Sequence, residues 1–375
     1  MKKHVVAMVL VGGRGTRLGA ITQHKAKPAV TFGGKYKLID FVLSNLAHAQ
    51  IDTVGIVTQY EPHELMHYIQ RGASWDLDVN DGGVHFLTPY TTREGTKWQR
   101  GTAHAVAQHL HFLNAYNPEL VLVLSGDHVY KMDYRRMLDH HRASGADITV
   151  GAFKPHDDLS RYGVLSLDEQ DRVTAFEEKP DAPASDLASM GVYVFTRTAL
   201  ENVLKQGVGD DLDFGRDIIP KALKEHYRVC GYYFDGYFRD VGTVESLFDA
   251  NLELLDHPEY LKIHDYTTHP IYTRTEDLPP HHNMSPDRVR DALVCDGTMI
   301  MGQVEHSVIS SNVLIKENAF VKNSLIFTGV KIGEHSRLEN VIVLEDTVIL
   351  PRTELVYDRP TVIDNETLWK VGDDR

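Results

Sequence analysis

Short apolar runs and longer segments of helical periodicity alternate along residues 1–255. Within 39–49, the apolar residues Ile39, Val42 and Leu46 recur at the i, i+3, i+7 spacing of one helix face. A second helix is predicted over 103–116. Strands that alternate with helices predict an α/β domain with a largely parallel sheet. The runs predicted as strands are 5–11, 53–58, 120–125, 148–153, 191–195 and 228–234.

The composition changes after residue 255. Five prolines fall within 256–290, and no clean periodicity crosses this segment. Prolines end helices and are excluded from central strands, so a linker is predicted here. The chain is therefore divided into a first domain over 1–255, a linker over 256–290 and a last domain over 291–375.

A 17-residue repeat occupies the last domain. The three apolar series in the same register are Val304, Val321 and Leu338; Ile309, Ile326 and Val343; and Ile315, Ile332 and Ile349. One inward apolar residue on each of three short strands per coil is typical of a hexapeptide-type parallel β-helix. Short antiparallel strands are the alternative, although three series in one register rarely arise by accident. Residues 291–294 predict a shorter fourth coil, and spacing alone leaves the handedness open.

Composition narrows the class of protein. Of the 375 residues, 42% are apolar and 25% are charged, the balance of an ordinary globular chain. The net charge of −14 argues against nucleic acid or an anionic membrane as the partner, since both require a basic face. Two cysteines, Cys230 and Cys295, exclude a disulfide scaffold and a four-cysteine zinc site. No apolar stretch reaches the ~18 residues of a membrane span, and no signal-type cleavage site follows 5–11, so we expect a cytoplasmic protein.

A glycine-rich segment directly follows the first predicted strand. In residues 12–18 (GGRGTRL), three glycines let backbone N–H groups approach an anion, and the neighbouring arginines favour phosphate. The segment lacks the Lys-Ser/Thr pair of a P-loop, and Leu18 stands where a dinucleotide fingerprint requires a third glycine. Three lysines follow within 25–35. These cations favour phosphate binding over a plain glycine turn.

A carboxylate, Asp127, follows the apolar run 120–125 in the segment 125–128 (SGDH). The carboxyl end of a parallel strand is where open α/β sheets bind ligands, and a carboxylate beside phosphates is a natural Mg²⁺ ligand. An Asp after Gly can also simply cap a turn. Two further charged segments, 176–180 (FEEKP) and 238–243 (FRDVGT), are either parts of a site or solvated strand ends.

Six segments form a joint pattern: 12–18 (GGRGTRL), 26–30 (AKPAV), 126–130 (GDHVY), 178–180 (EKP), 187–191 (LASMG) and 239–243 (RDVGT). In this order they resemble the bacterial glucose-1-phosphate adenylyltransferase family, also called ADP-glucose pyrophosphorylase. The resemblance covers nearly the whole chain. It implies a Rossmann-like nucleotidyltransferase domain followed by a left-handed parallel β-helix.

The resemblance also implies a reaction: ATP and α-D-glucose 1-phosphate give ADP-glucose, the glucosyl donor for glycogen synthesis, and diphosphate. The attacking phosphate oxygen is already ionised at neutral pH, so such a site needs cations and Mg²⁺ rather than a general base. The family further implies allosteric regulation, with effectors that the sequence does not identify. It implies a homotetramer, or a hetero-oligomer with a related regulatory subunit.

Site residues are carried over from the family position by position. The catalytic set is Arg17, Lys27, Asp127 and Lys179. The metal pair is Asp127 and Asp240. The ATP-binding residues are Gly12, Gly13, Gly15, Thr16, Arg17, Lys27, Gln59, Trp98 and Gly126. The residues for glucose 1-phosphate are Gln99, Gly163, Glu178, Lys179 and Ser189.

Three positions depart from the family pattern. Val11 replaces a usual Ala, Gln99 replaces a usual Tyr, and His24 replaces a Lys that some relatives use for activator binding. Phosphate chemistry does not identify the base, so a sugar-1-phosphate nucleotidyltransferase for UTP or dTTP is an alternative. A non-catalytic regulatory subunit of the same fold is another, although such a subunit has no need of the intact catalytic set.

Two short motifs point to other chemistry. Residues 63–67 (HELMH) match the H-E-x-x-H of zinc proteases, which would place both imidazoles on one helix face, but no Gly-x-x-His continuation follows. Residues 213–215 (DFG) imitate a kinase magnesium motif without the catalytic loop that precedes it in kinases. We interpret both as chance matches.

Overall fold

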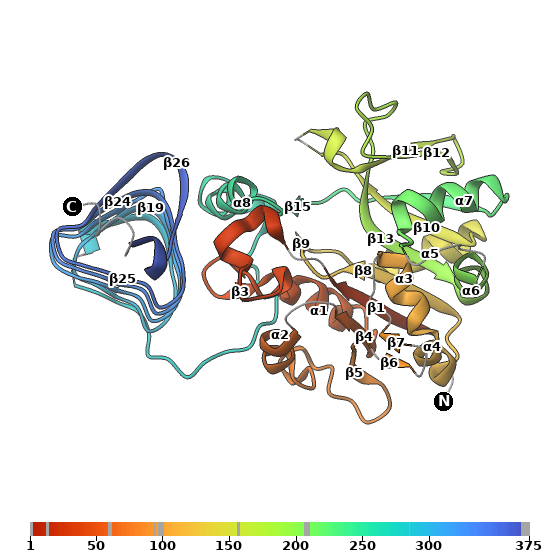
Figure 1. Cartoon of the computed structure of the whole chain (residues 1–375), viewed down its shortest axis with the longest axis horizontal. Coiled ribbons are helices and arrows are strands. Elements are labelled where there is room, and N and C mark those ends of the chain that lie inside the picture. The colour runs from red at the N-terminus through yellow and green to blue at the C-terminus, as the bar shows by residue number, and fades with distance from the viewer. Residues whose placement is uncertain are drawn as a thin grey trace. The chain divides into compact units, whose positions relative to one another are not determined.

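The computed structural model describes residues 3–12, 15–58, 62–89, 91–92, 95–96, 101–155, 158–205, 211–284 and 286–368. The chain forms two compact units (Figure 1). Unit 1 comprises Met1–Gly13 and Phe41–Phe238, and unit 2 comprises Arg14–Asp40 and Arg239–Arg375. The segment 14–40 therefore belongs with the C-terminal part of the chain. The boundaries at 255 and 290 stay predictions.

Unit 1 is built on a sheet that has nine strands among the described residues. Its main path, in spatial order, is β12 (Val173–Glu178), β11 (Gly163–Leu167), β13 (Ala188–Thr196), β8 (Leu120–Ser125), β1 (Val5–Val11), β4 (Thr53–Thr58) and β5 (Gly83–Leu87). Off this path, β10 (Ile148–Phe153) pairs with β13 and with β14 (Val229–Tyr233).

Parallel and antiparallel pairing divide this sheet. β8, β1, β4 and β5 run parallel to one another, and β10 is parallel to β14. β13 runs antiparallel to β8, β10 and β11, and β11 runs antiparallel to β12. The predicted parallel core is confirmed, and an antiparallel flank adds to it. The sequence analysis missed β11 and β12, which are buried over only part of their length and lack the long apolar run of the parallel strands.

The strands that were predicted match closely. Four of them, 5–11, 53–58, 120–125 and 148–153, coincide with β1, β4, β8 and β10. The run 191–195 is longer in the structure, as β13, and the run 228–234 is shorter, as β14. β1, β4, β8 and β10 are buried along almost their whole length, which explains their continuous apolar sequences.

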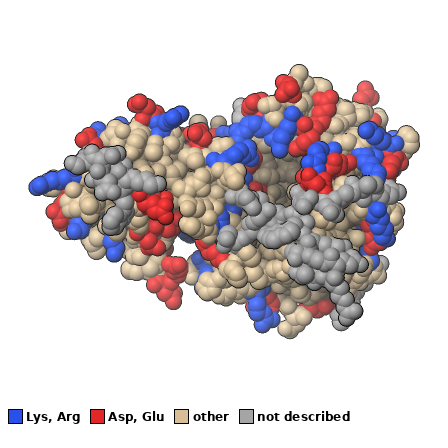
Figure 2. Space-filling view, viewed as in Figure 1, with Lys and Arg blue, Asp and Glu red and all other residues tan. Residues whose placement is uncertain are grey.

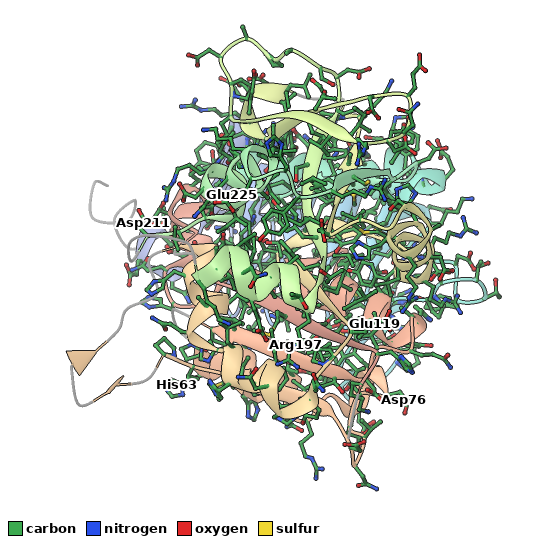
Figure 3. All side chains as sticks on the ribbon, turned by 90° about the vertical axis from the view of Figure 1, so that its right-hand side faces the viewer. His63, Asp76, Glu119, Arg197, Asp211 and Glu225 are labelled. Carbon is green, nitrogen blue, oxygen red and sulfur yellow. The ribbon has the colours of Figure 1, made fainter. Side chains whose placement is uncertain are left out.

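Helices flank the sheet. They are α1 (Leu38–His48), α2 (Pro62–Ile69), α3 (Thr102–Gln108), α4 (Leu110–Tyr116), α5 (Tyr134–Ser144), α6 (Arg197–Lys205) and α7 (Ile219–Lys224). Arg197 opens α6, and its backbone N–H donates to the carbonyl of Glu119 just before β8, at 3.1 Å (Figure 3). The segments β6 (Thr91–Thr92), β7 (Gly95–Thr96) and β9 (His128–Tyr130) complete the strands of unit 1.

The helix predicted over 103–116 is broken at His109. This residue has φ −107° and ψ 19°, outside the helical region, and separates α3 from α4. The break is bridged by i→i−3 hydrogen bonds, from His109 N–H to Val106 and from Phe112 N–H to His109. Burial of the imidazole lowers the pKa of His109 to about 4. Sequence periodicity did not reveal the break, because apolar positions continue on both sides of it.

Unit 2 combines an N-terminal segment of short helices and a hairpin with the helices and strands of the C-terminal part of the chain. Its N-terminal part holds the 3-10 helices η1 (Thr16–Thr22) and η2 (Lys27–Ala29) and the hairpin of β2 (Thr31–Phe32) and β3 (Tyr36–Lys37). Two helices follow in its C-terminal part, α8 (Val244–Asp256) and α9 (Pro258–Leu261). β15 (Phe238–Asp240) precedes α8, and the strands after α9 are β16 (His282–Asn283), β17 (Val289–Val294), β18 (Met299–Ile300), β19 (Gln303–Ile309), β20 (Leu314–Ile315), β21 (Phe320–Lys322), β22 (Leu325–Ile326), β23 (Lys331–Ile332), β24 (Arg337–Val343), β25 (Val348–Ile349) and β26 (Glu354–Ile363).

The strands of the last domain form the predicted parallel β-helix. Val304, Val321 and Leu338 lie opposite one another in successive coils, as do the two other predicted series. The members of all three series are at most 1% exposed. β17 pairs in parallel with β19, which confirms the additional coil at 291–294. The 17-residue register is therefore the register of the inward positions.

A polar ladder follows one corner of the coils. His306, Asn323 and Asn340 all have positive φ, of 40°, 45° and 57°, a conformation that Asn and His tolerate better than branched residues do. His306 Nδ1 lies 3.0 Å from Asn323 Oδ1, Asn323 Nδ2 donates to Asn340 Oδ1, and Asn340 Nδ2 donates to the carbonyl of Tyr357. Because Asn323 offers an oxygen acceptor, Nδ1 of His306 is the donor.

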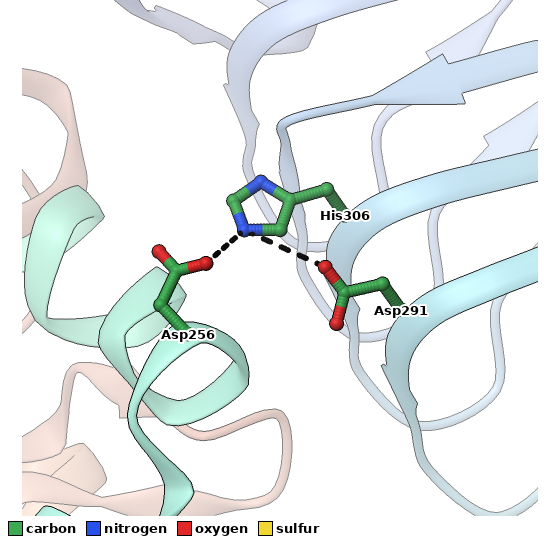
Figure 4. A group of neighbouring side chains, drawn as sticks. All are labelled: Asp256, Asp291 and His306. Atoms are coloured by element: carbon green, nitrogen blue, oxygen red, sulfur yellow. Dashed lines mark hydrogen bonds and ion pairs between the residues drawn. The ribbon is translucent and has the colours of Figure 1, made fainter.

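The other ring nitrogen of His306 faces two carboxylates (Figure 4). Nε2 lies 2.9 Å from Asp256 Oδ1, at the end of α8, and 3.8 Å from Asp291 Oδ2 in β17. Partial burial lowers the pKa of His306, but hydrogen bonds to Asp256 and Asn323 outweigh it, so the pKa is raised above its usual value near 6.5. The His306 ring thus links α8 to the first coils through both of its nitrogens.

The surface carries both signs of charge. On the face drawn in Figure 2, Lys and Arg side chains lie interspersed with Asp and Glu.

Among the described residues, no helix is both long and apolar enough to cross a membrane.

The inward register predicts a stability difference between two Asp substitutions. Ile326→Asp places a carboxylate at a position that is 0% exposed and should lower the free energy of unfolding by several kcal/mol, about 2–7 by transfer estimates. Val348→Asp, at a strand position 47% exposed, is the matched control and should stay within about 0.5 kcal/mol of wild type. Chemical denaturation measures both. Equal stabilities of the two variants would contradict the register.

The His306 contacts predict a pH-dependent contribution to stability. Because the pKa is raised on folding, the stabilisation is complete below pH 6.5 and is lost as the pH rises through the higher folded value. His306→Asn keeps a ladder side chain but removes the charge, so its loss of stability should be larger at pH 6 than at pH 9. His335→Asn, at an exposed position that also has positive φ, is the control. A His306→Asn deficit that is the same at both pH values would refute the charged link.

Candidate functional site

Two predicted ligand segments meet at the carboxyl edge of the parallel strands of unit 1. β1 and β8 are paired with Leu10 opposite Ser125, so Gly12 and Asp127 both follow at the same edge. Gly126 N–H donates to the carbonyl of Leu10 at 2.9 Å. The strand pairing therefore brings the start of the glycine segment beside the Asp127 turn, which is where open α/β sheets bind ligands.

Asp127 is held by its neighbours. The Ser125 hydroxyl donates to Asp127 Oδ1, and His128 Nε2 lies 3.6 Å from the same oxygen. The His128 ring packs edge-on against Phe238, with 5.1 Å between ring centroids. The region behind Asp127 is fixed by Asn45 of α1, which accepts from Met132 N–H and donates to the carbonyl of Tyr130. The carboxylate is half-buried and oriented, as a ligand for a hard cation would be.

A second group of predicted residues meets on the antiparallel flank. Gly163 of β11 lies opposite Glu178 of β12, and Val164 lies opposite Ala188 of β13, next to Ser189. Gly163, Glu178 and Ser189, which were carried over for the sugar phosphate, therefore lie on three adjacent strands, and Lys179 directly follows β12. A Cβ at Gly163 would lie 2.6 Å from Phe176 Cζ and 2.9 Å from Glu178 Oε2, so the glycine leaves space for both side chains.

The two charged side chains of this group, Glu178 and Lys179, differ in their exposure to solvent. Burial raises the pKa of Glu178, and the neighbouring Lys179 opposes the shift. Lys179 Nζ lies 3.5 Å from Glu178 Oε1, yet the lysine side chain is 63% exposed. Its backbone has φ 49°, and its N–H donates to the carbonyl of Tyr162. The arrangement presents one accessible cation beside a partly buried carboxylate.

The residues 213–215 contribute to this site structurally, a role that the sequence analysis missed. Asp213 accepts hydrogen bonds from Gly215 N–H and Arg216 N–H and so begins the helical turn Phe214–Ile218. Thr102 of α3 donates to the other Asp213 oxygen at 2.7 Å. A Cβ at Gly215 would clash with Glu178 Oε2. The Asp-x-Gly spacing, typical of a side-chain-capped turn, was the available signal.

A third group lies in unit 2. Lys27 is 8% exposed, and its Nζ donates to Asp240 Oδ1 at 2.8 Å. A Cβ at Gly242 would lie 3.0 Å from Arg17 Nη2 and 3.1 Å from Asp240 Oδ1, so this glycine lets the guanidinium and the carboxylate converge. Thr243 then caps α8 through a reciprocal pair of hydrogen bonds with Ser246. The side chains of Lys27 and Arg17 thus lie beside the segment 240–242, which supplies the carboxylate of Asp240.

Within the glycine segment, Gly15 directly precedes η1, the 3-10 helix that contains Arg17. Gly15 adopts the left-handed conformation, with φ 56° and ψ 27°, and its carbonyl accepts from Thr22 Oγ1 and Leu18 N–H. The following Thr16 and Arg17 are exposed. The turn therefore presents a hydroxyl and a guanidinium to solvent.

Some predicted residues are not placed together by the structure. Gly13, Gln59, Trp98 and Gln99 lie outside the described residues. Asp127 belongs to unit 1 and Asp240 to unit 2, so their joint use of one metal ion stays a prediction.

The zinc-protease motif has no support as a metal site. His63 and His67 are exposed on α2, and Figure 3 shows His63 at the periphery of unit 1. Within the described part of the chain, the one cluster of three or more potential ligands is Asp256, Asp291 and His306, so no third ligand joins the two histidines of α2.

Comparisons with known proteins agree with this architecture. The nucleotidyl transferase family model matches residues 6–257, and the GlmU-like C-terminal hexapeptide model matches residues 280–369. Glucose-1-phosphate adenylyltransferases of Bacillus mycoides (strain KBAB4) and Bacillus cereus (strain Q1) are each 45% identical to the chain over 352 residues. The enzyme of Bacillus cereus (strain ATCC 10987 / NRS 248) is 44% identical. Each alignment covers 93% of both chains. The chain belongs to the nucleotidyl transferase family and, within it, to the glucose-1-phosphate adenylyltransferases.

Proposed function

We propose that this protein transfers the adenylyl group of ATP to α-D-glucose 1-phosphate, giving ADP-glucose and diphosphate. The observation that carries the proposal is the 45% identity, over 93% of both chains, to curated glucose-1-phosphate adenylyltransferases. The grouping of Gly163, Glu178 and Ser189 on adjoining strands, with Lys179 directly after one of them, adds support from this chain's own geometry.

The reaction is a single displacement at phosphorus. An ionised phosphate oxygen of glucose 1-phosphate attacks the α-phosphorus of ATP, a new P–O bond forms, and the bond to the β-phosphate oxygen breaks. Diphosphate leaves with the electron pair of that bond. No proton has to be removed from the attacking oxygen, so the protein contributes positioning and positive charge.

The ATP side is assigned to the glycine segment and its cations. Backbone N–H groups at Gly12, Gly13 and Gly15, with Thr16 and Arg17, would bind the phosphates, and Gly126, Gln59 and Trp98 would complete the nucleotide site. Lys27 is a buried cation that Asp240 already orients at 2.8 Å. A phosphate would meet this charge preorganised, which lowers the cost of ordering it.

The sugar-phosphate side is assigned to the antiparallel flank. Lys179 is the accessible cation of this flank and would bind the phosphate of glucose 1-phosphate. Glu178, Gly163 and Ser189, with Gln99, would contact the glucose hydroxyls. Among them, Glu178 offers carboxylate oxygens as hydrogen-bond acceptors.

Asp127 and Asp240 fit a magnesium ion chemically. Both offer hard carboxylate oxygens, and Asp127 is oriented by Ser125. When bound, Mg²⁺ neutralises phosphate charge that develops in the transition state. In the protein itself, Lys27 partly neutralises Asp240 and so keeps this carboxylate compatible with nearby polyanions.

Further assignments follow the family. We propose a cytoplasmic enzyme of glycogen synthesis, regulated allosterically and assembled as a homotetramer or with a related regulatory subunit. A uridylyl- or thymidylyltransferase is the rival within the same chemistry, and a non-catalytic subunit is the rival outside it.

Product formation with three nucleotides separates these functions. The purified protein is incubated with glucose 1-phosphate and ATP, UTP or dTTP, with and without Mg²⁺, and released diphosphate is measured. We expect turnover with ATP and Mg²⁺ and at least tenfold less with the other nucleotides. Preference for UTP or dTTP would replace the adenylyl assignment, and no turnover with any nucleotide would favour the regulatory subunit.

Asp127→Asn should preserve the fold and reduce turnover by on the order of 10²-fold or more, since a charge that stabilises the transition state is removed. Circular dichroism melting checks the fold, and diphosphate release measures the rate. Asp139→Asn, whose carboxylate is 77% exposed on α5, is the matched control and should retain activity. Normal turnover by Asp127→Asn would remove this residue from the metal site.

Lys179→Gln should raise the apparent KM for glucose 1-phosphate about tenfold or more and leave the KM for ATP nearly unchanged, because it removes one charge-assisted contact from one substrate. Lys205→Gln, at an exposed lysine of α6, is the control. Steady-state kinetics with each substrate varied in turn gives both constants. An equal rise in both KM values would place Lys179 outside the sugar-phosphate site.

A further inference from the structure

The segment that carries Lys27 lies along the turns of the β-helix. At one end, a Cβ at Gly34 would meet Cys295 Sγ and Leu293 Cδ2, which leaves space only for glycine. At the other end, Lys25 Nζ lies 5.9 Å from the ring centroid of Phe327. Val294, Ile309 and Ile326 are in register, so these contacts fall on different coils. Residues 25–34 therefore span successive coils within unit 2.

One carboxylate of the β-helix fixes both sides of Lys27. Glu345 Oε1 accepts from Lys25 Nζ at 2.5 Å and from Thr31 Oγ1 at 3.4 Å. Lys37 Nζ donates to the same Thr31 hydroxyl. Lys27 lies between the two residues that Glu345 binds.

Glu345 is distinctive among the coils. Ile309, Ile326 and Val343 are in register, which places Ser311, Thr328 and Glu345 at equivalent turn positions. The two preceding coils thus have short hydroxyl side chains where this coil has a long carboxylate, and the first coil has the shorter carboxylate of Asp296 there. The β-helix core does not require the change, because this position faces outward from the strands that supply the core.

The backbone between Lys25 and Thr31 is short and ordered. Ala29 N–H donates to the carbonyl of Ala26, and Val30 N–H donates to that of Lys27, closing the 3-10 helix η2. Ala29 and Val30 are at most 1% exposed. A displacement of Lys25 or of Thr31 would therefore also displace Lys27, whose Nζ lies 2.8 Å from Asp240 Oδ1.

We propose that Glu345 is a positioning residue for the nucleotide site: through Lys25 and Thr31 it sets the place of Lys27. The inference rests on the proposed function, which assigns Lys27 to the ATP phosphates. Burial raises the pKa of Glu345, but Lys25 and Lys37 more than compensate, so the net pKa is lowered and the carboxylate is charged at neutral pH. The β-helix thus contributes to nucleotide binding without touching the nucleotide.

Glu345→Gln and Lys25→Met test the proposal in the full-length protein. The dissociation constants of ATP and of glucose 1-phosphate are measured by calorimetry, and amide hydrogen exchange is followed over residues 26–30. We expect ATP to bind about tenfold more weakly to each variant, as for loss of one charge-assisted hydrogen bond, with glucose 1-phosphate affinity unchanged. Exchange at Ala29 and Val30 should become faster.

The double variant and a control complete the test. Because both substitutions break the same contact between Lys25 and Glu345, ATP should bind the double variant no more weakly than it binds the single variants. Glu334→Gln, a β-helix carboxylate 3.8 Å from Lys316, is the matched control and should leave ATP affinity unchanged.

Three outcomes would overturn the proposal. They are ATP affinity within twofold of wild type in both single variants, equal losses for both substrates, and unchanged exchange over residues 26–30. If the wild-type protein uses UTP or dTTP, the adenylyl assignment fails, and the same comparison with that nucleotide decides the role of Glu345.

Discussion

A buried ammonium group is the constraint on which the nucleotide side of this protein depends. Lys27 is 8% exposed, and an unpaired charge at that depth would cost several kcal/mol. Asp240 satisfies it at 2.8 Å, and the missing side chain of Gly242 leaves space that both the Arg17 guanidinium and the Asp240 carboxylate approach. The structure of residues 25–37 depends on this pairing, because the 3-10 helix η2 and the β2–β3 hairpin hold Lys27 within hydrogen-bond distance of Asp240.

Charge placement also explains why the chemistry assigned to the site needs no proton-transfer residue. Its chemistry joins two polyanions, and the residues assigned to it are cations, glycines and carboxylates suited to a hard metal ion. Glu178 is the described site carboxylate whose pKa is raised. In the proposed reaction it binds a sugar hydroxyl, and the attacking oxygen needs no base.

Sequence patterns predicted the parts of the fold that bury one continuous apolar surface. β1, β4, β8 and β10 were correct to the residue because they are buried on both faces, and the β-helix was correct because its inward positions repeat every 17 residues. The patterns failed at β11 and β12, which are buried over only part of their length, and at the buried His109, which breaks a helix.

The predicted site residues were identified from sequence motifs, but the residues that support them in the structure were not. Gly215 and Gly242 matter through what a Cβ would strike, which depends on partners distant in sequence. The contact of Lys25 with Glu345 joins positions 320 residues apart, and no local periodicity encodes it. Such contacts became visible only with the packing of residues 14–40 in the same unit as the β-helix.

The dependence of kcat/KM for glucose 1-phosphate on pH tests most directly whether catalysis rests on charge and position. With saturating ATP and Mg²⁺, the account predicts one ionisation, near the second pKa of a phosphate monoester at about 6, and a plateau above it up to about pH 9. A further ionisation that disappears in Glu178→Gln or His128→Asn would show that a protein group transfers a proton. That result would contradict the account.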